Sequence, residues 1–476
     1  MKNLTILQMN DIHGYLELHN ELYYNDQGIT LKKAGGLSRI KKLADELRKE
    51  KDQILFLDNG DTIHGTYEAV KSEGADFTPL LNKLKIDAMT FHWDIAYGPD
   101  VLKEREQELD YPLLAINVYH ENTDELYMDP YLIKEISGIK VGIIGVACNI
   151  IDKTMPKHFS EGLYFTNGKE ELPHYIEEVR EQGAEIVILL SHLGFPQDMT
   201  ILSEIRGIDV CISGHTHNRI RDVIKVNDTY IIQSGSHGSF LGRLDLSVKH
   251  GRIAGVHHEL IDISEDLEED QEFKDMISEI MSPHREYLDQ IVGKTDVILH
   301  RGTSLECPMD NLLLKALLHE TGAEMAFSNG WRYGAPIDKG PVKMRDLHQI
   351  IPVNPPVSLV EITGKELLKM MEENLENTYS RDPLSQMGGY VKRALGIKVF
   401  FKVENAEGQR VQEMFVGSEK LDPEKTYRAT YVTNQGVPKK YGSNHEKLSV
   451  TAIDALENYL GKETFSLTYA DTYVLI

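Results

Sequence analysis

The chain has 476 residues, of which 41% are hydrophobic and 26% are charged. This composition is typical of a globular protein and excludes a fibrous or fully disordered chain. The length exceeds what one ordinary hydrophobic core accommodates, so we expect two domains. The formal net charge of -24 argues against nucleic-acid binding over a broad face, because such a surface would repel a polyanion.

The cysteines are few and widely spaced, at Cys148, Cys211 and Cys307. They form no CxxC pair and no disulfide framework, which fits a reducing compartment. The N-terminal sequence MKNLTILQMNDIHG has a short apolar run without a small-residue cleavage site, so it predicts a first strand and not a signal peptide. No stretch approaches the roughly 20 apolar residues of a membrane span. We therefore expect a cytoplasmic protein that does not bind membranes.

Apolar runs alternate with amphipathic segments over residues 1–265. This alternation predicts an α/β domain with buried sheets. Helices are expected at 35–50 and 169–183, and Gly183 stands where a C-cap would end the second. Strands are expected at 4–9, 53–58, 88–91, 112–117, 140–146, 185–191, 209–213 and 229–234.

The composition changes after residue 265. Residues 266–292 are highly charged with a helical period, which predicts a connecting helix. A second, mixed α/β domain is expected over 293–476. Its predicted helices lie at 310–324 and 365–379, and its predicted strands at 357–363, 397–403 and 426–433.

Four of the apolar runs in the first domain end in a polar cluster. Because ligands gather at the carboxyl ends of strands in α/β sheets, we expect these clusters to converge. Imidazole and carboxylate groups are good ligands for zinc, manganese and iron, and one carboxylate can bridge two metals about 3.5–4 Å apart. Any one of these histidines alone is more often an ordinary residue, but four clusters in this order favour a metal site. The clusters are NDIHG with Asp11 and His13, DNGD with Asp58 and Asp61, SHLG with His192, and GHTH with His215 and His217.

The motif order DxH, GD, SHxG, GHTH resembles that of the calcineurin-like metallophosphoesterases. Together with the connecting helix and the second domain, it resembles the two-domain 5'-nucleotidase family. The resemblance implies an N-terminal four-layer sandwich of two sheets flanked by helices and a smaller mixed α/β domain. It implies two divalent transition-metal ions (manganese, zinc or iron). One would be held by Asp11, His13 and His217 and the other by His192 and His215, with Asp61 bridging.

The segment TFHWDIAYG at 90–98 departs from the family pattern. The family has Gly-Asn-His-Glu/Asp and then an Asp, in which Asn ligates the second metal and the His-Asp pair acts near the leaving group. Aligned on the trailing Tyr-Gly, His92 takes the ligand position, Trp93 the catalytic His and Ala96 the orienting Asp. We predict His92 as a metal ligand. An alignment shifted by one residue would instead make His92 the catalytic His and leave Phe91 at the ligand position.

Loss of the His-Asp pair has a chemical consequence. General acid catalysis contributes about 10²–10⁴-fold, so without it a leaving group of low pKa is favoured. The sequence His-Trp-Asp at 92–94 is similar to the His-Trp-Glu-like motif that the sulfur-oxidation thiosulfohydrolases carry at this position. Those enzymes expel a sulfur leaving group. His64, in DTIHGT, is a candidate replacement catalytic donor. The alternative interpretation is a loop histidine that faces water.

The second domain carries candidate substrate contacts. The segment SNGWRYGAPIDKGPV at 328–342 is similar to the family's phosphate-binding segment. Arg332 can clamp a phosphate or sulfonate and neutralise transition-state charge. Tyr390 either stacks on a flat base or is an ordinary packed aromatic. The predicted substrate-binding residues are Asn329, Arg332, Tyr390, Arg393 and Asn434.

The sequence thus predicts a di-metal hydrolase of phosphate esters or anhydrides, in which a hydroxide activated by the metals attacks a nucleotide-like small molecule. The first alternative is thiosulfohydrolase-like cleavage of sulfate from a sulfonated, sulfur-linked substrate. The second is a degenerate metal-containing binding protein. The sequence sets neither the oligomeric state nor the metal.

Overall fold

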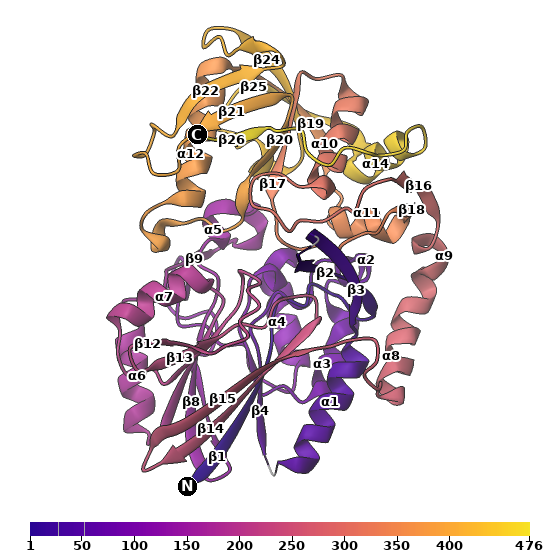
Figure 1. The fold of residues 1–476 in the computed structure, drawn as a ribbon. Coiled ribbons are helices and arrows are strands. Elements are labelled where there is room, and N and C mark those ends of the chain that lie inside the picture. The colour runs from indigo at the N-terminus through magenta and orange to yellow at the C-terminus, as the bar shows by residue number, and fades with distance from the viewer. Residues whose placement is uncertain (27, 52) are drawn as a thin grey trace. The chain divides into compact units, whose positions relative to one another are not determined.

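The computed structural model describes residues 1–26, 28–51 and 53–476, and these residues form two compact units (Figure 1). The change to unit 2 at Pro283 falls inside the predicted connecting helix. There α8 (Gln271–Met281) and α9 (Arg285–Leu288) are joined by a 3-10 turn, since proline lacks the N–H that a continuous α-helix needs. Unit 1 comprises Met1–Glu21, Lys32–Lys153 and Lys157–Pro283, and unit 2 comprises Leu22–Leu31, Thr154–Pro156 and His284–Ile476.

Unit 1 is built on two sheets whose apolar faces pack against each other. Leu4 and Leu55 of one sheet share a buried core with Ile143 and Ile188 of the other. The five-stranded sheet has the order β15 (Arg252–Asp262), β14 (Phe240–Lys249), β1 (Lys2–Met9), β4 (Ile54–Asp58), β5 (Ala88–Met89). The six-stranded sheet has the order β12 (Ile224–Val226), β13 (Thr229–Ile232), β11 (Val210–Ser213), β10 (Ile186–Ser191), β8 (Ile139–Val146), β7 (Tyr131–Ile136).

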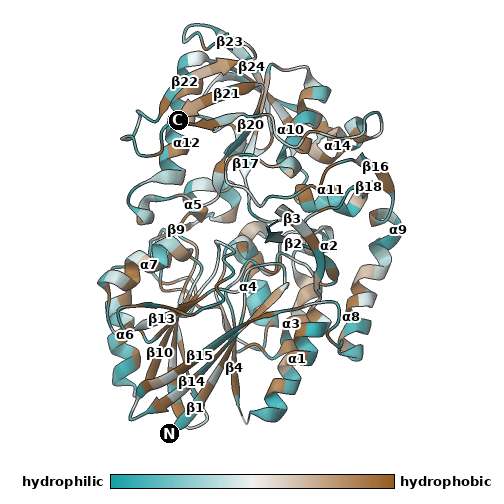
Figure 2. Ribbon diagram, viewed as in Figure 1, coloured by the Kyte–Doolittle hydropathy of each residue, from teal (hydrophilic) through white to brown (hydrophobic). Residues whose placement is uncertain are grey.

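Helices cover the outer faces of both sheets in unit 1 (Figure 1). The amphipathic α1 and α8 lie side by side on one face, and α6 and α7 pack on the strands of the six-stranded sheet. Figure 2 shows hydrophobic strands inside and hydrophilic helix surfaces outside. The predicted sandwich of two sheets flanked by helices is confirmed. The helices are α1 (Leu37–Glu50), α2 (Tyr67–Lys71), α3 (Thr78–Leu84), α4 (Pro99–Glu108), α5 (Ile151–Thr154), α6 (Leu172–Glu181) and α7 (Phe195–Glu204).

Two further pairs of strands form two-stranded sheets of their own. The strands β2 (Leu18–Asn25) and β3 (Gly28–Gly35) pair with each other, as do β6 (Val118–His120) and β9 (Leu163–Phe165). Three 3-10 helices are η1 (Ala75–Phe77), η2 (Trp93–Tyr97) and η3 (Lys157–Phe159).

The strand predicted at 112–117 is wrong. The backbone there bonds to three different neighbours, because Leu114 N–H donates to Met89, Ala115 N–H to Asp129 and Ile116 N–H to Gly145. No ladder is continuous, so only isolated bridges form. The apolar run is buried for another reason: its side chains fill the core beside the sheet edges.

Unit 2 is a mixed α/β unit. Helix α12 packs on β19, β20 and β22, and its Leu367 and Met371 enter a core shared with Phe327 and Val399. The five-stranded sheet has the order β20 (Tyr390–Leu395), β17 (Met325–Gly330), β24 (Thr426–Tyr431), β19 (Pro356–Thr363), β25 (Ser443–Thr451), and the four-stranded sheet β23 (Glu419–Lys420), β22 (Val411–Val416), β21 (Ile397–Phe401), β26 (Tyr473–Leu475). The remaining elements are the pair β16 (Ile291–Thr295) and β18 (Gly340–Lys343), and α10 (Pro308–Thr321), α11 (Met344–Ile350), α12 (Gly364–Tyr379), η5 (Pro383–Ser385), α13 (Thr433–Gly436) and α14 (Ala452–Leu460).

The three cysteines are buried and unbonded to one another. Among the described residues, no helix has both the length and the apolar character that crossing a membrane requires.

A buried ion triad ties α10 to β20 in unit 2. Asp310 accepts from Arg301 Nε at 2.9 Å and from Arg393 Nε at 2.8 Å. The other guanidinium nitrogens of Arg393 donate to the carbonyls of Ser304 and Thr303. Because both cations are buried, Asp310 is the charge that makes their burial tolerable.

Replacement of Asp310 by alanine should destabilise unit 2 by about 3–5 kcal/mol, since it leaves two buried guanidinium groups without their counter-charge. Urea unfolding measures the loss. The matched control is Glu413→Ala, which breaks an exposed pair with Lys420 and should change stability little. Equal effects of the two substitutions would contradict the importance of the triad.

Candidate metal centre

Seven histidine and aspartate side chains gather at the carboxyl ends of β1, β4, β5, β10 and β11. The four motifs contain six of them, and the seventh, His92, follows β5, whereas the motif residue Asp58 belongs to neither ligand group. Within the part of the chain that the structure describes, they form two groups, each with ligand atoms within 4.8 Å of one another. We call them the first group and the second group. The first group is Asp11, His13 and His217; the second group is Asp61, His92, His192 and His215.

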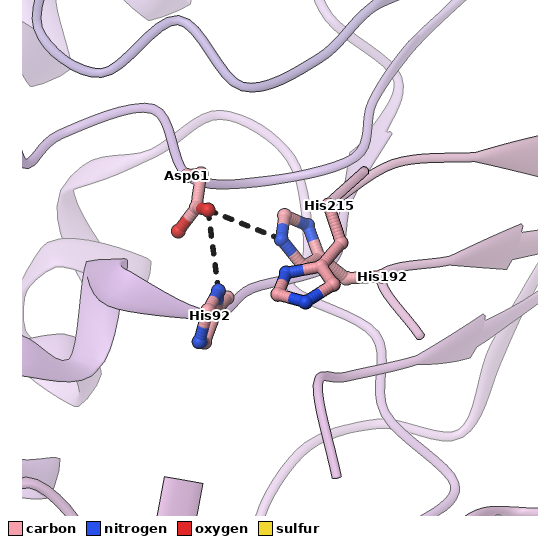
Figure 3. Close-up of side chains that lie close together, drawn as sticks. All are labelled: Asp61, His92, His192 and His215. Atoms are coloured by element: carbon pink, nitrogen blue, oxygen red, sulfur yellow. Dashed lines mark hydrogen bonds and ion pairs between the residues drawn. The ribbon is translucent and has the colours of Figure 1, made fainter. Parts of the chain in front are cut away.

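In the second group, one carboxylate oxygen faces two imidazoles (Figure 3). Asp61 Oδ2 lies 3.2 Å from His92 Nδ1 and 3.2 Å from His192 Nε2. Its other oxygen, Oδ1, accepts from the backbone N–H of Trp93 at 2.7 Å. Oδ2 is therefore the oxygen that is turned toward the histidines.

The first group is equally compact. His13 Nε2 and His217 Nε2 lie 3.2 Å apart, and His217 Nε2 lies 3.3 Å from Asp11 Oδ1. His13 Nε2 is also 3.6 Å from Asp61 Oδ2. Asp61 thus borders both groups, which is the place of a bridging ligand.

The donor set fits divalent transition metals. Ligand atoms separated by 3.2–3.6 Å match the edges of a coordination shell with bonds of about 2.0–2.2 Å. Nitrogen and carboxylate oxygen donors suit manganese, zinc and iron. The two groups can therefore hold a pair of such ions, with Asp61 between them.

The backbone at this centre is strained. Non-glycine residues seldom adopt positive φ, and such residues concentrate at functional sites. Gly60 also has a positive φ of 90°, and a Cβ there would lie 2.5 Å from the carbonyl oxygen of Thr90, so only glycine lets this loop approach so closely. Five of the seven side chains sit on left-handed backbone: Asp11, His13, Asp61, His215 and His217, with φ of 53°, 50°, 55°, 69° and 56°.

Asn59 fixes the orientation of His192. Its carbonyl accepts from His192 Nδ1 at 2.6 Å, which leaves Nε2 as the ring nitrogen that faces Asp61. The Asn59 side-chain amide donates to the carbonyls of Ser191 and Ile212. One residue of β4's terminal loop therefore ties together the ends of β10 and β11.

Asp94 pins the loop that carries Asp61. Its carboxylate accepts from the backbone N–H groups of Asp61, Thr62 and Ile63 at 2.7, 2.8 and 3.0 Å. Burial, together with the charge of Asp61, raises the pKa of Asp94 despite these bonds. Asp94 is two residues from His92, so the same turn positions the ligand His92 and holds the loop that carries Asp61.

The charges of the centre are strongly coupled. Burial alone would raise the pKa of Asp61, but His92, His192 and His13 outweigh it and hold that pKa well below its usual range. Burial lowers the pKa of His13 to about 3. Burial would lower the pKa values of His92 and His192, but Asp61 outweighs it, so the pKa of His92 lies well above its usual range and that of His192 rises to about 9. Metal binding requires neutral imidazoles, so an ion in the second group would displace the protons of these two histidines.

His92 lies inside the second group, whereas Phe91 packs edge-on against Tyr127 in the core. This geometry favours the alignment that gives His92 the ligand position. Trp93 and Ala96 lie on η2, outside both groups.

His64 is fully buried, so the interpretation of a loop histidine facing water is wrong. Its ring stacks on Trp93 with centroids 4.8 Å apart and an interplanar angle of 25°. Burial lowers the pKa of His64 to about 4, so its imidazole is neutral at pH 7.

The predicted substrate residues all lie in unit 2. Arg332 is half-buried, donates to the Gly389 carbonyl at 3.0 Å and lies 5.0 Å from the Tyr390 ring centroid. The Arg393 guanidinium lies 5.3 Å from the same centroid but is buried in the ion triad. Asn329 is half-buried at the end of β17, and Asn434 is exposed on α13, where its Oδ1 accepts from Lys439 N–H.

Several residues at the centre escaped the sequence analysis. Asn59 stands inside the DNGD motif and Asp94 inside the segment 90–98, but no role was predicted for either, because their side chains bind backbone groups of other segments. A third group comprises His19, Glu21 and His237. Its His237 stands in GSHG just after the predicted strand 229–234, so the strand-then-polar-cluster pattern could have revealed it.

The chain matches two known families. Residues 4–219 match the calcineurin-like phosphoesterase family, and residues 291–437 match the 5'-nucleotidase C-terminal domain. The chain is a calcineurin-like phosphoesterase with a 5'-nucleotidase C-terminal domain. The resemblance read from four short motifs is thereby confirmed, and the protein is a phosphoester hydrolase by family.

Relatives of this phosphoesterase align over most of its length. Human 5'-nucleotidase is 24% identical over 87% of the chain and 78% of its own length. The trifunctional nucleotide phosphoesterase protein YfkN of Bacillus subtilis is 24% identical over 87% of the chain, which spans only 30% of YfkN.

Two solved structures share the fold over the whole chain. The sulfate thiohydrolase SoxB of Thermus thermophilus has a TM-score of 0.93 at 22% identity, with 100% of this chain and 97% of SoxB covered. A 5'-nucleotidase precursor, also from Thermus thermophilus, has a TM-score of 0.88 at 22% identity, with 100% and 99% covered.

Elemental analysis of the purified phosphoesterase should find about two transition-metal ions per chain, one for each group. His92→Ala should reduce this to about one, because it removes a ligand of the second group alone. Asp61→Asn should weaken both sites. His174→Ala, an exposed histidine of α6, is the control and should keep both ions. One ion or none in the unaltered protein would overturn the two-metal assignment.

Proposed function

We propose that this phosphoesterase hydrolyses phosphate esters or anhydrides of nucleotide-like small molecules with two divalent transition-metal ions. The observation that carries the proposal is the position of Asp61, whose Oδ2 borders both ligand groups. The names of the relatives, nucleotide phosphoesterase and 5'-nucleotidase, support the substrate class.

Two such ions would activate a water molecule and neutralise the charge of a phosphoryl group. The chain's own residues supply the frame for this chemistry. Asp61 holds its Oδ2 toward both groups because Trp93 N–H occupies Oδ1. Asn59 sets the tautomer of His192, and Asp94 keeps the Asp61 loop in place.

Manganese, zinc and iron are the metals that we propose for the centre. All three accept histidine nitrogen and carboxylate oxygen, and the two groups contain no thiolate. Reconstitution of metal-free protein with each ion in turn, followed by activity measurement, distinguishes them.

Arg332 and Tyr390 are the substrate contacts that we propose in unit 2. Arg332 is half-buried and lies beside the Tyr390 ring, so an anion and an aromatic group could be bound close together. Asn329 and Asn434 are proposed to add hydrogen bonds. Arg393 is the weaker candidate, because Asp310 and two carbonyls take up its guanidinium nitrogens.

A thiosulfohydrolase-like reaction is the second candidate. It is favoured by Trp93 and Ala96, which stand where the family keeps a proton-donating His-Asp pair. A sulfur leaving group needs no such donor, since thiols have a pKa of about 8.5. SoxB, which shares the fold, is named a sulfate thiohydrolase, a related activity.

A substrate panel separates these reactions. We expect turnover of p-nitrophenyl phosphate and bis-p-nitrophenyl phosphate, and slower turnover of AMP by about 10²–10⁴-fold, because AMP must expel a ribose alkoxide without the His-Asp pair that the family keeps. UDP-glucose tests anhydride cleavage and a thiosulfonate tests the second candidate. AMP turnover equal to that of the nitrophenyl esters would contradict the missing donor.

His64 is the residue that we propose to assist the leaving group, through an N–H of its neutral imidazole. His64→Ala should lower kcat for AMP by about 10-fold or more and affect the nitrophenyl esters less, because these need little assistance. His174→Ala serves as control. Unchanged turnover of AMP by the His64 variant would remove His64 from the mechanism.

A further inference from the structure

The third group, His19, Glu21 and His237, borders the first group. The His237 ring centroid lies 5.9 Å from those of both His13 and His217. Its backbone N–H donates to the Asp11 carbonyl at 2.7 Å, and its φ of 58° is left-handed like those of the ligands. The imidazole is thus built into the edge of the metal centre.

A hydrogen-bonded network holds Glu21 facing His237. Arg219 Nη2 donates to Glu21 Oε1 at 2.6 Å, and Ser239 Oγ donates to Glu21 Oε2 at 2.6 Å. Glu21 Oε2 lies 3.7 Å from His237 Nδ1. Burial would raise the pKa of Glu21, but His237 and Arg219 lower it to about 2. An ionised carboxylate at this position keeps the proton on Nδ1 and leaves a lone pair on Nε2.

The Nε2 atom of His237 is buried and has no hydrogen-bond partner among the described residues. Buried nitrogen atoms are nearly always paired, so an orphan needs an explanation. The polar neighbours of the His237 ring, Glu21 and Ser236, lie near its other nitrogen, Nδ1. A lone pair that its own fold does not use is available to a bound molecule.

A third cation is a poor occupant for this group. The guanidinium of Arg219 already pairs with Glu21, and a divalent ion there would face that positive charge. Both Glu21 oxygens also hold close hydrogen bonds. The network is arranged to orient an imidazole, not to bind a metal.

We propose that His237 is a catalytic residue whose Nε2 accepts a hydrogen bond from the attacking water, with Glu21 as the residue that positions it. This inference rests on the proposed hydrolytic function. In that reaction the water oxygen forms its bond to phosphorus as the bond to the leaving oxygen breaks. The leaving oxygen takes up one proton of the water, and the other stays on the phosphate product.

His237 thereby acts on the nucleophile, whereas the pair that Trp93 and Ala96 replace acts near the leaving group. The two roles do not substitute for each other. The preference for good leaving groups should therefore persist whether or not His237 is present.

Activity of three variants on bis-p-nitrophenyl phosphate tests the proposal. His237→Ala should lower kcat by about 10²-fold. Glu21→Gln should lower kcat by about 10-fold at an unchanged KM, because it loosens the orientation of His237 and removes no substrate contact. His174→Ala should match the unaltered protein. Circular dichroism and thermal unfolding establish that each variant is folded.

Binding of inorganic phosphate to the metal-loaded protein gives a readout besides activity. The phosphate hydroxyl occupies the position of the former water, so His237→Ala should weaken its affinity about 5–10-fold by calorimetry. Glu21→Gln serves as the second variant should His237→Ala fail to fold.

The outcomes separate the two proposals. An unaltered protein that turns over no phosphoester would end the proposed function, and the phosphate affinities would still judge His237. Turnover that survives His237→Ala unchanged, with equal phosphate affinity, would overturn the role of His237 alone. Loss of a metal ion in the His237 or Glu21 variant would overturn it as well, since the third group would then be a metal site.

Discussion

The carboxylate of Asp61 is the constraint on which the metal centre depends. Its Oδ2 lies within 3.2–3.6 Å of imidazoles from three different loops, so its position fixes the separation of the two ligand groups. A bridging ligand must be ionised, and the surrounding histidines hold the pKa of Asp61 low against the effect of burial. His92, His192 and His13 each place a nitrogen near this oxygen, and Asp94 holds the loop that carries it.

The loop of Asp61 is held from three sides at once. Asp94 takes three of its backbone N–H groups, Asn59 joins it to β10 and β11, and Asp58 accepts from Gly60 N–H and the Thr62 hydroxyl. Burial raises the pKa of Asp58 well above its usual range. The strained backbone at Asp61 persists because these bonds over-determine it. The functional side chains thus lie on well-bonded loops at strand ends, and the two packed sheets support these loops.

The sequence predicted the parts of the fold that leave a periodic or motif signal. The buried runs of β1, β8 and β10 and the amphipathic α1 were predictable from hydrophobic pattern. The strand predicted at 112–117 failed because an apolar run reports burial, not pairing. The hairpin β14–β15 was not predicted, because β15 is mostly half-exposed and has no apolar run. Asp94 and Glu21 could not be found, since their roles depend on partners far away in the chain.

The stack of His64 on Trp93 limits what the phosphoesterase can do to a leaving group. A large apolar ring stands where the family keeps an imidazole, and the imidazole stacked on that ring, His64, is buried and neutral. A neutral imidazole can donate a hydrogen bond but is a weak acid, so it assists a poor leaving group far less than an imidazolium would. We therefore expect the chemistry to favour substrates whose leaving group departs as a stable anion. Anhydrides, aryl esters and sulfur-linked groups share this property, and alkyl monoesters such as AMP do not.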